Sequence, residues 1–131
     1  LLSSGTSHSA QYALAAMFKA ACDGEYNFLE TVREYGNRAK KMKAIFEKHG
    51  FHIVYDKDID QTIGDGFYFT VGYKDLTGGE LMYKLLFYGI SAISLDTTGS
   101  RQQGLRVCTS FIQDNQYDDL DQRLAEFANE N

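Results

Sequence analysis

Residues 28–55, FLETVREYGNRAKKMKAIFEKHGFHIVY, change their hydrophobic period once, at Gly50. Before Gly50, apolar side chains recur at alternating steps of four and three residues, which is the spacing of one face of an α-helix. These positions are Phe28, Val32, Tyr35, Ala39, Met42 and Phe46. After Gly50, apolar side chains alternate with other residues at a period of two, as in a β-strand. A long amphipathic helix that leads directly into a strand indicates an α+β domain.

Patterns on both sides of this stretch predict further elements. Residues from about 9 to 22 carry apolar side chains at helical spacing and predict a first helix. Residues 66–73 are rich in aromatic side chains and predict a long strand, because such residues favour sheets. The acidic residues 56–61 between the two predicted strands are expected to form a connection.

The second half of the chain repeats this alternation of helix and strand. A third helix is predicted from about Gly79 to Tyr88. Thr77 precedes it and Glu80 follows three residues later, which is the spacing of a capping box. Two β-prone runs follow, at residues 90–95 and 105–111, and turn-forming or polar residues join them. Each run is expected to be a strand of the same small sheet.

A last helix is predicted to begin near Asn115. Its apolar stripe consists of Tyr117, Leu120, Leu124 and Phe127. The predicted order of elements is ααββαββα, within one domain that spans residues 1–131. The sequence therefore predicts an α+β fold in which helices pack on one face of a small mixed or antiparallel sheet.

Composition narrows the possible functions. The chain has 131 residues, of which 44% are apolar and 24% charged, as in a folded globular domain. Its net charge of -5 argues against binding to duplex nucleic acid, which requires clustered cations. No apolar run approaches the roughly 20 residues of a membrane span, and no signal peptide is visible. Cys22 and Cys108 form no disulfide framework, so we expect a cytoplasmic protein. Because the chain opens at Leu1 without an initiating Met, we expect that upstream sequence has been removed.

Two short motifs resemble known sites but lack the required context. The alternate carboxylates of residues 56–60 resemble the start of a calcium loop. However, Gln61 stands where that loop needs Gly, and Phe67 stands where it needs a bidentate Glu. Gly64-x-Gly66 precedes a predicted strand instead of opening a helix after one, so it does not predict a dinucleotide-binding turn. We expect no metal site in this chain.

Arg106 lies inside the predicted strand 105–111. Strand alternation puts Leu105, Val107, Thr109 and Phe111 on one face, and Arg106, Cys108 and Ser110 on the other. A guanidinium in such a position is costly to remove from water unless an anion meets it. Its planar fork suits a carboxylate held through two parallel hydrogen bonds. Arg106 is therefore either part of a structural ion pair with one of the eighteen Asp and Glu residues or a carboxylate-binding residue.

The run from Gly104 to Phe111, placed after a Gly/Ser loop and before a terminal amphipathic helix, resembles the end of a known enzyme family. It is similar to the C-terminal small domain of fold-type-I pyridoxal-phosphate-dependent aminotransferases, class I/II, of the aspartate aminotransferase type. The long helix, the aromatic motif at residues 66–69, Gly89 and the strand at residues 90–95 also agree with that family. The resemblance covers nearly all of the chain.

The resemblance implies roles for three residues and a cofactor. Arg106 matches the arginine that binds the substrate α-carboxylate, while Phe67 and Tyr68 match aromatic positions near the substrate. The family's chemistry depends on pyridoxal phosphate bound by a Schiff-base lysine, an aspartate and a phosphate cup in the large domain. None of the lysines here stands in the family's Ser-x-x-Lys context. The resemblance therefore implies that the cofactor belongs to the full-length parent and that this fragment alone is inactive.

The resulting functional expectation is amino-group transfer between an amino acid and a 2-oxo acid. Arg106 would orient the substrate for proton removal by the upstream lysine, and the lobe would close onto its own large domain within a homodimer. One alternative is the lobe of a pyridoxal-phosphate-dependent lyase or decarboxylase, since a carboxylate clamp serves these reactions too. Others are a freestanding carboxylate-binding regulatory domain and a purely structural interaction domain. The upstream coding sequence separates the enzymes from the last two.

Overall fold

The computed structural model describes residues 5–64 and 66–131. Leu1, Ser3 and Ser4 at the start of the chain lie outside the described residues, as does the middle position of the Gly64-x-Gly66 motif. The chain divides into two units, Leu1–Arg33 and Glu34–Asn131, with the boundary inside helix α2 (Phe28–Lys48). The first unit contains helix α1 (His8–Cys22), which confirms the first predicted helix. Every residue of α1 is described, and none of them is buried.

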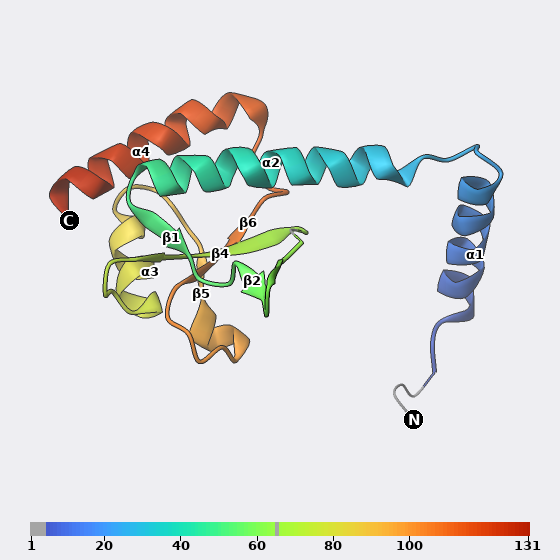
Figure 1. Ribbon diagram of the computed structural model, residues 1–131, viewed down its shortest axis with the longest axis horizontal. Helices are drawn as coiled ribbons and strands as arrows, with labels where there is room; N and C mark the ends of the chain where they lie inside the picture. Colours follow the sequence, from blue (N-terminus) through green and yellow to red (C-terminus); the bar gives the residue numbers. More distant parts are fainter. Residues whose placement is uncertain (1–4, 65) are drawn as a thin grey trace. The chain divides into compact units, whose positions relative to one another are not determined.

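The second unit contains an antiparallel sheet, whose described strands follow the order β1-β4-β6-β5 (Figure 1). These strands are β1 (Phe51–Ile53), β4 (Tyr68–Tyr73), β6 (Leu105–Cys108) and β5 (Ile93–Ser94). Helices α3 (Gly78–Leu86) and α4 (Tyr117–Glu130) complete the unit. The predicted α+β class is confirmed, and the strands of the main sheet and the α-helices follow the predicted order.

The pairing register gives the sheet two different faces. Phe69 of β4 pairs with Val107 of β6, and both side chains are buried beneath the helices. Thr70 pairs with Arg106, and both point to the opposite face because successive side chains alternate along a strand. This opposite face carries the candidate site described below.

One hydrophobic core joins the helices to the sheet. It includes Met42 and Phe46 from α2, Leu81 and Leu85 from α3, and Tyr117, Leu120, Leu124 and Phe127 from α4, with Phe51, Phe69, Val71, Tyr73, Leu105 and Val107 from the strands. In the second unit, α2 and α4 run along the same side of the sheet (Figure 1). The prediction that the helices pack on one face is therefore confirmed.

The ends of α3 are fixed by local chemistry. The Thr77 hydroxyl accepts a hydrogen bond from the Glu80 backbone N–H at 3.3 Å, and the Glu80 carboxylate accepts one from the Thr77 N–H at 2.9 Å. This is the predicted capping box, and it satisfies two backbone donors at the start of the helix. Beyond the helix, Gly89 takes a positive φ of 70°. This backbone conformation favours glycine, and a Cβ atom there would also displace the end of the Arg123 side chain, since it would lie 2.0 Å from Nη1.

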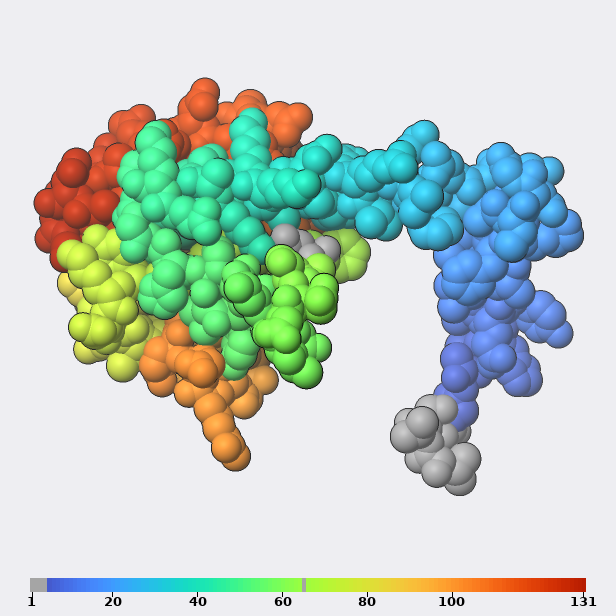
Figure 2. Space-filling model, in the orientation of Figure 1, coloured from blue at the N-terminus to red at the C-terminus, as the bar shows by residue number. Residues whose placement is uncertain are grey.

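Two segments differ from the sequence-based expectations. The acidic connection contains a small hairpin, β2 (Lys57–Asp58) paired with β3 (Gln61–Thr62), and β5 is much shorter than the predicted strand 90–95. The 3-10 helix η1 (Leu95–Thr98) ends β5, and it protrudes with the residues that follow it in orange at the lower edge of this unit (Figure 2). Its Thr side chains donate to the carbonyls of Ser94 and Leu95, so side chains replace the sheet as backbone partners.

Asp121 ties the C-terminal end of α2 to α4. Its carboxylate accepts a hydrogen bond from Lys48 Nζ at 2.6 Å and pairs with His49 Nε2 at 2.7 Å. The hydrogen bond from Lys48, and then the one with His49, lowers the pKa of the Asp121 carboxyl. The resulting stabilisation is complete above the pKa of an unfolded aspartate, about 3.9. It is lost as the pH falls through the lower pKa of the folded state.

We expect Asp121→Asn to lower the free energy of unfolding at neutral pH by at most about 1 kcal/mol, because the ion pair is partly exposed. The difference between the wild type and the variant should shrink as the pH falls from about 5 to about 2. Urea unfolding at several pH values measures this difference. A difference that is the same at every pH would contradict a role for the ionised carboxylate.

Candidate functional site

Arg106 lies in the middle of the sheet on the face that the helices leave uncovered. It belongs to β6 and stands in register between Thr70 of β4 and Ile93 of β5. Its side chain is half-buried. Strand alternation predicted this orientation correctly, because Leu105, Val107 and Thr109 are all buried on the helix side.

The guanidinium of Arg106 packs against the aromatic ring of Tyr68. The guanidinium carbon lies 4.5 Å from the ring centroid, within the range of a cation–π interaction. Tyr68 pairs with Cys108, which lies two residues after Arg106 on the neighbouring strand. The side chains of Tyr68 and Arg106 are therefore diagonal neighbours on one face of the sheet. Within residues 5–64 and 66–131, no carboxylate forms an ion pair with Arg106. The alternative of a structural ion pair therefore finds no partner in the described part of the chain.

Phe67 lies apart from this pair. Its ring packs edge-on against Tyr35 of α2, with ring centroids 4.9 Å apart and an interplanar angle of 88°. Phe67 precedes Tyr68 by one residue, so strand alternation directs it to the other face of the sheet. The structure thus brings Arg106 and Tyr68 together and places Phe67 against the long helix.

A cavity of about 740 Å³ borders Arg106 and Tyr68. It lies at the edge of β6 where β5 is too short to cover it, and helices α2, α3 and α4 contribute to its walls. Most of the lining is apolar: Met42, Phe46, Leu85, Ile90, Ala92, Ile93, Leu105, Val107, Phe111, Ile112 and Leu120. A volume of this size is typical of small-molecule sites, which run from roughly 300 to 1,000 Å³.

Sequence reasoning did not identify the apolar walls of this cavity. Ile93 could have been found, because its predicted strand could pair with the strand of Arg106. Phe111 could not, since the predicted strand 105–111 put it on the face opposite to Arg106. That expectation is wrong: β6 ends at Cys108, and Phe111 is 89% exposed and lines the cavity.

Two further charged residues line the cavity, and they neutralise each other. Arg123 Nε donates to Asp119 Oδ2 at 2.8 Å, and Arg123 Nη1 donates to the carbonyl of Tyr88 at 2.9 Å. This arginine therefore holds the segment after α3 in place. Among the described lining residues, Arg106 is the cation without a carboxylate partner.

The described residues do not fit a complete pyridoxal phosphate site. Such a site requires a lysine whose amine reaches the cofactor inside a cavity, and the described residues that line this cavity include none. Lys48 is bound to Asp121, Lys84 donates to Asn131, and Lys41 lies over the Tyr117 ring. No reaction step can be assigned to the cofactor from these side chains.

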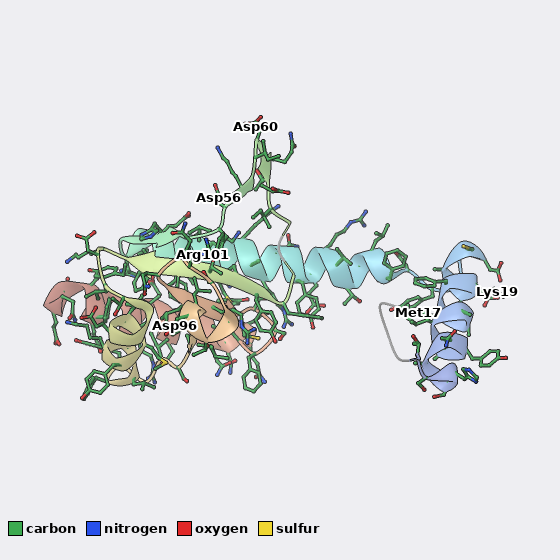
Figure 3. All side chains as sticks on the ribbon, turned by 90° about the horizontal axis from the view of Figure 1, so that it is seen from below. Met17, Lys19, Asp56, Asp60, Asp96 and Arg101 are labelled. Carbon is green, nitrogen blue, oxygen red and sulfur yellow. The ribbon has the colours of Figure 1, made fainter. Side chains whose placement is uncertain are left out.

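The described part of the chain shows neither a metal site nor a membrane-spanning helix. No cluster of three or more His, Cys, Asp or Glu residues could hold a metal ion there. Asp56 and Asp60 lie at the base and near the tip of the β2–β3 hairpin, which projects from the second unit (Figure 3). Within residues 5–64 and 66–131, no helix is both long enough and apolar enough to cross a membrane.

Comparisons with known proteins show what the fold resembles. No protein-family model matches the chain, and no curated protein matches it. Among solved structures, a NifS-like protein is similar, with a TM-score of 0.55, 19% identity and 78% of this chain covered. The aminotransferase Aro9 from C. albicans, solved with ligands, is similar with a TM-score of 0.50, 20% identity and 74% coverage. This chain spans 29% and 24% of those two proteins, so the likeness is to a part of each. Because both sequence identities are low, at 19% and 20%, these comparisons show a likeness of fold alone.

Proposed function

We propose that this chain is the small, substrate-closing lobe of a pyridoxal-phosphate-dependent aminotransferase, which transfers an amino group between an amino acid and a 2-oxo acid. The observation that carries the proposal is that Arg106 lines the cavity and that its guanidinium has no carboxylate partner among the described residues. The likeness in fold to part of an aminotransferase supports it.

In this proposal, Arg106 binds the α-carboxylate, which amino acids and 2-oxo acids share. Two parallel N–H donors of the guanidinium fix both the position and the plane of that carboxylate. The Tyr68 ring packs against the guanidinium and restricts its orientation. Because β6 is held between β4 and β5, the bound carboxylate would be held by a rigid element.

Pyridoxal phosphate, when bound, supplies the electron sink for chemistry at the substrate α-carbon. The proposal places the cofactor and its lysine in the remainder of a longer protein, of which residues 1–131 are the C-terminal small domain. The partial coverage of both similar structures supports this division. A cytoplasmic homodimer that closes its small lobe over the substrate completes the proposal.

The full-length gene product provides the direct test. We expect the coding sequence ahead of Leu1 to encode a large α/β region with a Ser-x-x-Lys motif. The expressed protein should exchange amino groups between amino acids and 2-oxo acids in a coupled assay. Release of carbon dioxide or loss of a side-chain group instead would identify a decarboxylase or lyase. An open reading frame that starts immediately before Leu1 would contradict the proposal.

The role of Tyr68 can be tested separately from that of Arg106. We expect Tyr68→Leu to raise KM roughly two- to fivefold, because an exposed cation–π contact contributes about 0.5–1 kcal/mol. Tyr68→Phe keeps the aromatic ring and should restore the KM of the wild type. Steady-state kinetics with one amino acid at varied concentration measures both variants. Equal KM values for the Leu and Phe variants would show that the ring does not position Arg106.

A further inference from the structure

We infer that the cavity beside Arg106 accepts a carboxylic acid whose remaining part is apolar, such as an aromatic or large aliphatic side chain. This inference rests on the proposed function, since it assigns the substrate class of the same site. It depends on the distribution of charge and apolar surface along the cavity wall, which differs from what a dicarboxylic acid requires.

Apolar residues line the cavity together with Arg106, and one of them is its neighbour in the sheet. Ile93 is the cross-strand neighbour of Arg106 and is itself 45% exposed, so its side chain is available to a ligand. Phe111 lines the same cavity and is itself 89% exposed. A ligand carboxylate at Arg106 would therefore place the rest of the molecule against Ile93 and Phe111. Burial of apolar ligand surface there is favourable because it removes that surface from water.

A second acidic group would meet an unfavourable environment in the same cavity. The other cation of the lining, Arg123, already donates to Asp119 and to the carbonyl of Tyr88. Asp119 also lines the cavity, but its carboxylate is paired with Arg123, so the described lining offers no second unpaired cation to a second ligand carboxylate. A second carboxylate would lose hydration in this cavity without gaining a cationic partner, which is unfavourable. The lining therefore favours a monocarboxylate with an apolar tail over a dicarboxylate.

The cavity lies entirely within the second unit, so this chain can be tested by itself. Isothermal titration with 3-phenylpropanoate, propanoate and glutarate compares an apolar tail, a short tail and a second carboxylate. We expect 3-phenylpropanoate to bind on the order of tenfold more tightly than either of the other two acids. Arg106→Leu should weaken its binding by a similar factor or more.

Two substitutions test which residues contact the apolar part of the ligand. Phe111→Ala and Ile93→Ala should each lower the affinity for 3-phenylpropanoate severalfold and leave that for propanoate unchanged. Phe87→Ala is the matched control, because Phe87 is also an exposed aromatic residue, at 73%, and does not line the cavity. Thermal unfolding followed by circular dichroism shows whether each variant remains folded.

The possible outcomes separate this inference from the proposed function. Equal affinities for the three acids, all lost in Arg106→Leu, would overturn the apolar preference and leave the carboxylate clamp intact. Tighter binding of glutarate, or no binding of 3-phenylpropanoate, would also overturn the inference, while the assay of the full-length protein would still decide the proposed function. Binding of 3-phenylpropanoate that does not depend on Arg106 would contradict both.

Discussion

Arg106→Leu in the full-length enzyme is expected to lower kcat/KM by about 10²- to 10³-fold, for amino acids and 2-oxo acids alike. A charge-assisted hydrogen bond contributes about 1.5–3 kcal/mol, and the guanidinium offers two in parallel. Leucine retains much of the aliphatic volume and removes all of the donors. Because the substrates of both half-reactions carry the same α-carboxylate, kcat/KM should fall in both directions. Steady-state kinetics in the two directions measures the effect.

Two control variants separate the carboxylate contact from charge and from general damage. Arg106→Lys keeps the positive charge without the planar fork, so its kcat/KM should fall between those of the wild type and the leucine variant. Arg101→Leu makes the same substitution at an exposed arginine that does not line the cavity, and it should leave the kinetics unchanged. Unchanged kinetics in Arg106→Leu, or an equal loss in Arg101→Leu, would reject the assignment of Arg106.

The helices were the most predictable part of the fold, because each carries a periodic signal over several turns. The stripe of α4 is an example, since Tyr117, Leu120, Leu124 and Phe127 are all buried as predicted. The stripe of α2 is only half buried. Ala39, Met42 and Phe46 enter the core, while Phe28 and Val32 are largely exposed. The same spacing therefore predicts a helix correctly without showing which of its turns is covered.

Strand lengths were less predictable, because a β-prone composition does not decide where pairing ends. The run 105–111 has strand-forming residues throughout, but β6 stops at Cys108. Its last β4 partner is Tyr68, and the chain bends after that pair. At the end of the run 90–95, side chains of η1 bond to the backbone carbonyls of Ser94 and Leu95, whereas residues 90–92 at its start lie outside β5. Such competition depends on tertiary geometry that local propensity does not contain.

The candidate site was predictable only in part. Strand parity put Arg106 on the uncovered face, and the resemblance to aminotransferases added Tyr68 and Phe67. The alternation that places Tyr68 beside Arg106 also directs Phe67 toward α2, so the two aromatic residues lie on different faces. The cavity itself combines residues from separate helices and strands, and no single stretch of sequence carries its shape. The sequence alone therefore did not predict the apolar lining of the cavity or the hydrogen bond from Arg123 to Asp119.

Phe127→Ala is expected to lower the free energy of unfolding by about 3–5 kcal/mol, a large part of the roughly 5–15 kcal/mol of a typical domain. The Phe127 side chain is fully buried at the meeting point of α4 and the sheet. Its ring packs against Phe51, Tyr73 and Tyr88 at centroid distances of 5.6, 5.0 and 5.5 Å.

Truncation of Phe127 removes these aromatic contacts and leaves a cavity that the surrounding rings cannot fill. Urea unfolding followed by circular dichroism measures the loss. The control is Phe87→Ala, the same substitution on an exposed surface of the same unit, which should change the free energy of unfolding by no more than about 0.5 kcal/mol. Similar losses in the two variants would show that α4 does not anchor the core as described, and the position of β6 beneath it would then need another source of support.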